Sequence, residues 1–238
     1  MALKLSIFLS IAFFVLTSIA MIAYTGGSLF HPAEAHYFFI GNFYSDLGRY
    51  RDFAGNVNGI PMALFAASLV AASVGQFIHH KVLHEWLIHF CPPRLSVVSK
   101  ISYMFSGSAS MGLLCVAATP WDVLFILHTI AVDITFISLF VANFGFGVVL
   151  FFDQSLSSGM RYIKASVAVV IVAYLFLLRI GPNPFTDERS ANIQSLGQKC
   201  VVASIILAVC LGSIIMLRAN RVRCQALPDI SLGRVKNA

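Results

Sequence analysis

The stretch VLFILHTIAVDITFISLFVANFGFGVVLFF, residues 123–152, decides the fold of this chain. Asp133 is its only side chain that is charged at neutral pH, and most of the other residues are apolar. As a helix it would be about 45 Å long at 1.5 Å per residue, against roughly 30 Å for the hydrocarbon core of a bilayer. We therefore expect a membrane-spanning helix whose extra length is taken up by tilt or by projection into the cytoplasm.

Five further apolar stretches flank this one, at residues 5–24, 59–78, 101–119, 165–180 and 201–217. Over the whole chain 58% of residues are hydrophobic, only 11% are charged, and the mean hydropathy is +0.85. Soluble domains carry about 25% charged residues. Because a helix satisfies its own backbone hydrogen bonds in lipid, the sequence predicts an all-α polytopic membrane protein. We expect residues 1–238 to form a single six-transmembrane-helix bundle.

Basic residues predict how the bundle is oriented. If the N-terminus is inside, the cytoplasmic segments hold eleven of them: Lys4, Lys81, Arg94, Lys100, Arg161, Lys164, Arg218, Arg221, Arg223, Arg234 and Lys236. The outer side holds five: Arg49, Arg51, Arg179, Arg189 and Lys199. Positive charge concentrates on cytoplasmic loops, so both termini are expected to be cytoplasmic, with a long first outer loop at residues 25–58.

The net charge of +6 is therefore mainly an orientation signal. Nucleic-acid binding would need a clustered basic surface on a recognisable fold, and the sequence has neither, so no nucleic-acid partner is expected. Compact loops and few targeting signals favour a bacterial inner (plasma) membrane.

The first apolar stretch also has features of a secretory signal peptide. Lys4 precedes it, and Ser18-Ile-Ala20 resembles a small-residue cleavage site. Its apolar run is longer than the roughly 7–15 residues of a signal peptide, so we expect a retained helix. Cleavage would leave the remaining topology unchanged, because the next connection is outside in either case.

The predicted outer loop exceeds the length of a passive link. Its apolar and aromatic residues Phe38-Phe39-Ile40 and Phe43-Tyr44 indicate packing onto the bundle or into the membrane interface. In Tyr44-Ser-Asp-Leu-Gly-Arg49, serine and aspartate can bond nearby amides and glycine permits positive φ, which favours a tight turn. The alternative is a ligand contact, formed by Ser45, Asp46, Gly48 and Arg49. Both interpretations hold if the turn positions Asp46 over the bundle.

The residues just before the 123–152 stretch indicate how its helix begins. Thr119, Pro120 and Asp122 fit a helix start, with a hydroxyl cap, a proline in the first turn and a carboxylate near the positive end of the dipole. Capping is one interpretation of Asp122, and a functional carboxylate is the other.

His128 and Asp133 lie deeper, about 12 Å and about 20 Å along the helix from Pro120. Ionisable residues at such depth usually face the bundle interior or a water-filled cavity. Five residues at about 100° each separate the two side chains by about 140°, so they are not expected to share a pocket. We expect His128 to meet Asp46 or Ser45 of the loop. For both residues a satisfied structural hydrogen bond and a functional ligand or proton site remain open.

Asp133 then needs a partner on another helix, and a serine of residues 106–110, Tyr174 or a water is available. Arg179 lies beside Gly181-Pro182 at a helix end and is expected to extend to the outer headgroups. Small residues four apart, at Ser106/Ser110 and Ser108/Gly112, predict that the 101–119 helix packs closely against a neighbour.

Ser45-Asp-Leu-Gly48, placed after one helix and a long loop, resembles the Ser-Asp-x-Gly signature of the DRAM autophagy-modulator family. It also resembles the related prokaryotic six-helix membrane family of unknown function, whose motif is followed by an Asn that Asn56 or Asn58 would supply here. Thr119-Pro-Trp-Asp122 with His128 resembles a Pro-x-Asp…His element of that prokaryotic family. The resemblance covers roughly residues 5–152. It implies six helices with both ends inside, and no established chemistry.

A histidine-rich run, Ile78–His89, follows the second apolar stretch. His80 and His84 are four apart and share a helix face, which suits a metal or haem. The run is also amphipathic up to Pro92-Pro93, which favours an extension of the 59–78 helix into the cytoplasmic interface. The five cysteines lack zinc-site spacings. We expect no metal and no cofactor.

Three function classes follow. We favour a non-enzymatic bundle whose outer vestibule binds a lipid or a partner helix, since no reaction motif is present; its candidate residues are Ser45, Asp46, Gly48, Arg49, His128 and Asp133. The alternative is a lipid-modifying enzyme in which Asp46, Asp122 and His128 converge. The second alternative is a transporter or proton pathway through Asp133. Expected partners are membrane lipids, with a membrane protein or a second copy of the chain as further options.

Overall fold

The computed structural model describes residues 1–89, 91–153 and 156–235, with side chains up to residue 220. Six long α-helices account for most of it: α1 (Ala2–Ala23), α2 (Gly59–Ile88), α3 (Pro93–Ala118), α4 (Phe125–Phe152), α5 (Ser158–Ile180) and α6 (Glu188–Val235). A short 3₁₀ helix, η1 (Tyr44–Gly48), lies in the α1–α2 loop. The predicted cytoplasmic side chains of Arg221, Arg223, Arg234 and Lys236 lie outside the described residues.

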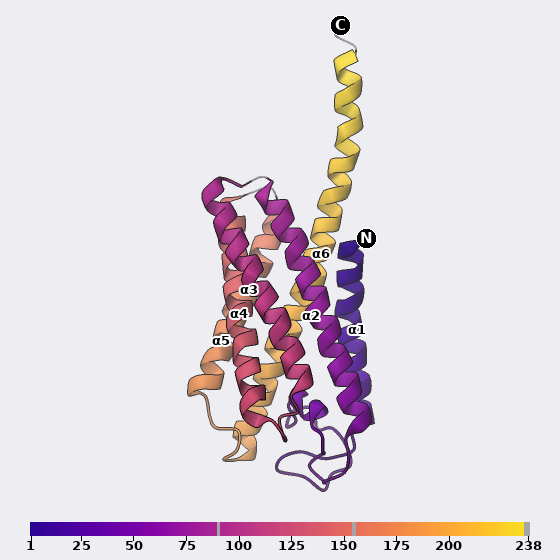
Figure 1. Ribbon diagram of the computed structural model, residues 1–238, viewed down its shortest axis with the longest axis vertical. Helices are drawn as coiled ribbons and strands as arrows, with labels where there is room; N and C mark the ends of the chain where they lie inside the picture. Colours follow the sequence, from indigo (N-terminus) through magenta and orange to yellow (C-terminus); the bar gives the residue numbers. More distant parts are fainter. Residues whose placement is uncertain (90, 154–155, 236–238) are drawn as a thin grey trace.

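The helices run side by side in one bundle, with both chain termini at the same end and the α1–α2 loop across the other (Figure 1). We call these the termini end and the loop end. Consecutive helices contact one another and α1 also contacts α6, so the helices close into a ring. Within the described residues, all six helices are long and apolar enough to cross a membrane. The predicted all-α, multi-pass membrane architecture is confirmed to this extent.

Several helices begin earlier than their apolar stretches indicated. Helix α3 starts at Pro93 instead of residue 101, α5 at Ser158 instead of 165, and α6 at Glu188 instead of 201. A proline fits the first turn of a helix, where its missing N–H costs nothing. Hydropathy does not detect these first turns because they contain polar residues. Some of these side chains contact other helices or the α1–α2 loop. The predicted extension of α2 is confirmed, since α2 continues to Ile88.

The helices bury polar side chains together with apolar ones, and they leave many other large apolar side chains exposed on the outside of the bundle. Fully or nearly fully buried serines occur on five of them, including Ser6, Ser68, Ser106, Ser138 and Ser213. Large apolar side chains such as Phe8, Met104, Ile126 and Val169 are more than half exposed. This arrangement suits lipid, where an outward apolar side chain costs nothing and small or hydroxyl residues allow helices to approach.

Helices α3 and α4 pack closely at Gly112. A Cβ on Gly112 would overlap the Thr135 hydroxyl and lie 3.3 Å from the Thr135 Cα. A Cβ on Gly107, on the same helix, would meet only the edge of the Phe77 ring at 3.7 Å. The packing role predicted for the small residues of α3 therefore applies to Gly112 in particular.

We predict that Gly112→Ala destabilises the bundle by about 1–3 kcal/mol, because the added methyl forces α3 away from α4. Gly107→Ala is the matched control and should leave stability within about 0.5 kcal/mol of the wild type. Thermal unfolding of the two variants in the same mild detergent measures the difference. Equal melting temperatures for the two would contradict the close α3–α4 contact.

Candidate functional site

The α1–α2 loop is organised around the buried carboxylate of Asp46. Its Oδ2 accepts hydrogen bonds from the Phe43 amide at 2.8 Å and from Asn42 Nδ2 at 3.2 Å. Its Oδ1 accepts the indole N–H of Trp121 at 3.1 Å, from the connection between α3 and α4. One carboxylate therefore shapes the start of η1 and fastens the loop to a segment 75 residues away.

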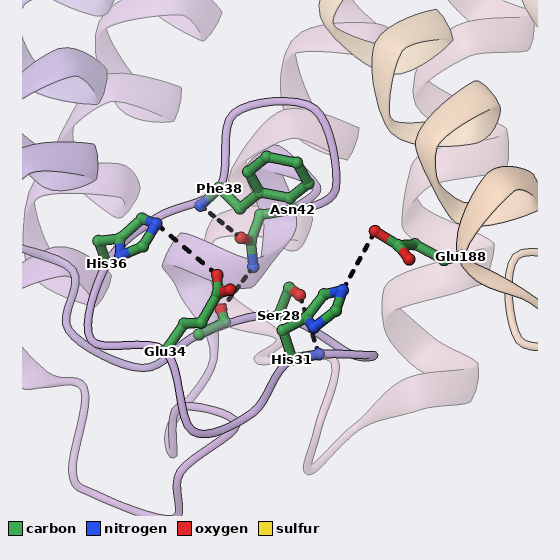
Figure 2. Close-up of polar contacts among 8 residues, drawn as sticks. Ser28, His31, Glu34, His36, Phe38, Asn42 and Glu188 are labelled. Carbon is green, nitrogen blue, oxygen red and sulfur yellow. Dashed lines mark hydrogen bonds and ion pairs between the residues drawn. The ribbon is translucent and has the colours of Figure 1, made fainter.

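Two asparagines complete the fold of the loop. Buried Asn42 donates to the Gly27 carbonyl at 2.8 Å and accepts the Phe38 amide at 2.8 Å, so it bridges the two arms of the loop (Figure 2). Asn58, just before α2, donates to the carbonyls of Leu47 and Arg49 at 3.0 and 3.1 Å. Asn58 thus closes the Ser-Asp-Leu-Gly stretch from the other side.

The loop is also attached to the start of α6. The Tyr44 amide donates to Gln198 Oε1 at 2.7 Å, and the Ser195 hydroxyl donates to the Ile40 carbonyl. At the edge of the loop, His31 forms an exposed ion pair with Glu188 at 3.1 Å (Figure 2). The prediction that the loop packs back onto the bundle is confirmed.

Lys199 makes a further attachment from inside α6. Its buried ammonium donates to the Asn42 carbonyl and lies 5.2–5.6 Å from the centres of three aromatic rings, those of Tyr37, Phe39 and Tyr44. We had expected Lys199 in an outer connection as a topology signal. It is instead a buried contact of the loop.

Gly48 and Arg49 both pack against aromatic side chains of the protein. The predicted tight turn is present as the 3₁₀ helix η1, which ends at Gly48, but this glycine does not have a positive φ. A Cβ there would come within 2.8 Å of the Phe65 ring, and glycine is what lets the loop approach α2. The guanidinium of Arg49 lies over the rings of Phe53 and Trp121, at 4.0 and 4.4 Å.

The capping interpretation of Asp122 is wrong. Helix α4 begins at Phe125, and Thr119 is the C-terminal cap residue of α3. The Asp122 carboxylate instead accepts the amides of Tyr50 and Arg51 at 2.9 and 3.0 Å, which gives the loop a second anchor beside Trp121. The Asp122 carboxylate therefore bonds the backbone of the loop and not the first turn of α4. No local sequence pattern around residue 122 predicts this contact.

His128 does not make the predicted hydrogen bond with Asp46 or Ser45. It contacts Thr119, which is nearer in the sequence. His128 Nδ1 lies 2.7 Å from the Thr119 carbonyl. Since a carbonyl only accepts, Nδ1 carries the proton, and Nε2 of the neutral ring is left as an acceptor.

The expected partner of Asp133 is also wrong. Asp133 pairs with Arg179 of α5 at 2.8 Å, and not with a serine of α3 or with Tyr174. Arg179 bends to this carboxylate, although 59% of its side chain stays exposed. The pair joins α4 to the last turn of α5, which ends at Ile180.

Two cavities lie beneath the loop. The inner one, of about 70 Å³, is enclosed mainly by apolar side chains of α1, α2, α3, α4 and α6. The outer one, of about 170 Å³, lies between the loop, the starts of α4 and α6 and the end of α5. Four residues line both: Ser45, His128, Val132 and Gln198. Asp46 lines the outer cavity, whereas Asp122 and Asp133 line neither.

Sequence reasoning missed several residues that build this site. The sequence patterns include Trp121 only as part of a motif, place Lys199 only among the outer basic residues, and give no signal for Gln198 or Asn42. Gln198 and Lys199 precede the apolar stretch at residues 201–217, so hydropathy does not mark them as part of the bundle.

His80 and His84 of α2 do not share a ligand, because each bonds a different side chain. His80 Nδ1 bonds the Ser106 hydroxyl at 2.7 Å, and His84 Nδ1 bonds the Ser99 hydroxyl at 2.8 Å. Both serines belong to α3, so this histidine face is an interhelical contact.

The chain matches no protein-family model, no curated protein and no solved structure.

We predict that Asp46→Ala opens the α1–α2 loop, because it leaves the donors of Phe43, Asn42 and Trp121 without their acceptor. Each orphaned buried donor costs about 1–3 kcal/mol, so hydrogen exchange at residues 42–49 should accelerate by about tenfold or more. Glu34→Ala is the control, since among the described side chains the Glu34 carboxylate pairs with exposed His36 at the loop surface. Unchanged exchange in Asp46→Ala would contradict the anchoring role.

Asp46 also predicts a pH dependence. Burial raises its pKa from 3.8 to about 6, against the opposing effect of the hydrogen bonds from Phe43, Asn42 and Trp121 and of nearby Arg49. The folded state therefore holds this proton more tightly than the unfolded state. The resulting stability is complete below about pH 4 and is lost as the pH rises to about 6.

We predict that the melting temperature falls across this interval by the equivalent of up to about 3 kcal/mol. In Asp46→Asn, which cannot ionise, the fall should be absent. Parallel melting curves at a series of pH values measure it, and identical slopes for the two proteins would rule out Asp46 as the source.

Proposed function

We propose that this protein binds a single amphiphilic lipid in the two adjacent cavities at the loop end, without modifying it chemically. The observation that carries the proposal is that Ser45, His128, Val132 and Gln198 line both cavities, so the two lie side by side. In our proposal one elongated molecule extends from one cavity into the other. Apolar cavities with a few placed polar groups are typical ligand sites. The loop, held by Asp46, covers them.

The lining favours an uncharged headgroup. In the described part of the chain, Asp46 is the only charged side chain that lines either cavity. At the junction, His128 Nε2 offers an acceptor and the Ser45 hydroxyl offers a donor and an acceptor. Arg49 and Lys199 are turned to aromatic rings and to backbone carbonyls. A lipid with a hydroxyl or amide headgroup and an apolar chain fits this chemistry better than an anionic phospholipid.

The outer end of the site gives lipid a lateral route. Phe125 and Phe185 line the outer cavity and are about half exposed on the bundle surface. Leu178 and Pro184 line the same side, where α5 ends before the chain turns into α6. A chain dissolved in the bilayer can therefore enter between α4 and the α5–α6 connection without crossing the polar loop.

In our proposal the loop end faces away from the cytoplasm and the termini end faces it. The distribution of basic residues, eleven on the termini side and five on the loop side in the sequence, supports this orientation. We further propose a bacterial inner membrane as its location.

The enzyme alternative has less support. Asp122 is bonded to the backbone of the loop, Asp46 to three donors and His128 to a carbonyl. The transporter alternative rested on Asp133, which pairs with Arg179.

We predict that native mass spectrometry of the wild type, released from mild detergent, shows one bound lipid. Val132→Phe should reduce the bound fraction by about tenfold or more, because its ring fills the junction where the two cavities meet. Ile134→Phe is the matched control: Ile134 is two residues away on the lipid-facing surface, 46% exposed, and should leave binding unchanged.

Equal loss in both variants would point to general destabilisation and overturn the assignment to the cavities. A wild type free of lipid, or one carrying a stoichiometric polypeptide instead, would overturn the proposed ligand.

A further inference from the structure

A second polar centre lies inside the bundle towards the termini end, away from the cavities. Its central residue is Lys164, which is completely buried in α5. The ammonium nitrogen lies 2.8 Å from His80 Nε2 of α2 and 3.2 Å from Asn143 Oδ1 of α4. We had counted Lys164 as a basic residue of a cytoplasmic connection. It lies instead about 9 Å along α5 from its first residue, Ser158.

Lys164 has no acidic partner. Across the side chains that the structure describes, the ion pairs within 4.0 Å involve His31, His36, Lys81 and Arg179, and none reaches Lys164. A buried charge without a counter-charge is expensive in a protein and in a bilayer. Amines in such a place usually serve a function, and this one has a basic partner in direct contact.

The contact between Lys164 and His80 constrains their protons. Two nitrogens at 2.8 Å need one N–H directed at one lone pair. Either Lys164 donates to a His80 ring that is bare at Nε2, or His80 donates from Nε2 to a neutral amine. A charged amine beside a doubly protonated ring would set two donors, and two positive charges, against each other. The pair therefore accommodates at most one excess proton.

The surroundings leave this proton no acidic competitor. From α2, His79 lies beside His80 with ring centres 5.2 Å apart, and its Nδ1 bonds the Ser213 hydroxyl of α6. From α3, the Ser106 hydroxyl bonds His80 Nδ1. Asn143 and Phe146 face the pair from α4, and both are uncharged. His79 Nε2 is buried and has no partner, so a second charge on this face has nothing to stabilise it.

We propose that Lys164 and His80 form a binding site for a single proton within the membrane-spanning bundle. The proton is held between α5 and α2, and its gain or loss reverses the hydrogen bond between the two nitrogens. The Ser106 hydroxyl responds, because a serine both donates and accepts. The site is separate from the lipid cavities, since neither Lys164 nor His80 lines them.

The test follows both nitrogens by NMR in the full-length protein, reconstituted in phosphatidylcholine nanodiscs and labelled with ¹⁵N at the lysine Nζ and histidine ring positions. The spectra are recorded from about pH 5 to about pH 10, a range that spans ordinary histidine and nearly reaches ordinary lysine values. Lys164→Met and His80→Gln assign the two signals. We expect the Lys164 and His80 signals to change together, in one step that corresponds to one proton.

His84→Gln is the matched control, because His84 is one turn further along α2, also bonds a serine of α3, and lies outside the pair. It should leave the shared midpoint unchanged, whereas Lys164→Met should move the His80 midpoint by at least about one pH unit, a tenfold change in proton affinity. Separate midpoints for the two wild-type signals would overturn the proposal, as would a His80 titration insensitive to the loss of the amine. If Lys164→Met does not fold, the wild-type protein alone still tests the proposal. A lysine signal that has the same titration midpoint as His80 is then assigned to Lys164, and the absence of such a signal contradicts the proposal.

Discussion

The hydrogen bonds to the Asp46 carboxylate are the interaction on which the loop end of this protein depends. They join two segments that are distant in sequence: residues 42–46 of the loop, where η1 begins, and the connection before α4. A carboxylate offers four lone-pair sites and can gather several N–H groups at once, which a serine or an amide cannot do. Because the loop is held in this way, it contributes Ser45 to both cavities and Asp46 to the outer one.

The bundle contains two polar centres with different chemistry. At the loop end an acid, Asp46, is surrounded by donors and lies above a mostly apolar cavity. Nearer the termini end a base, Lys164, is surrounded by another base and by neutral acceptors. Both are buried, and neither forms an ion pair with the other kind of charge within the described side chains. The ion pair of Asp133 with Arg179 lies between α4 and α5 at the bundle surface, where both residues keep part of their exposure.

Parts of the site were predictable from local sequence. The aromatic loop, the importance of Asp46 and the inward position of His128 followed from the cost of placing such groups in water or in lipid. The roles of Asp122, Arg179 and Lys164 did not follow. Each of these side chains is bonded to a group on another element, and a charge near a helix end looks the same in the sequence whether it meets solvent, a loop or a neighbouring helix.

Hydropathy and backbone hydrogen bonding act on each segment separately, so the six apolar helices could be predicted from the amino-acid sequence. The polar atoms that meet inside the bundle could not be predicted in this way. Interhelical partners depend on the rotation and depth of each helix, as the pairing of Lys164 with His80 across 84 residues illustrates. A shift of one residue turns a helix by about 100° and would exchange an inward side chain for a lipid-facing one.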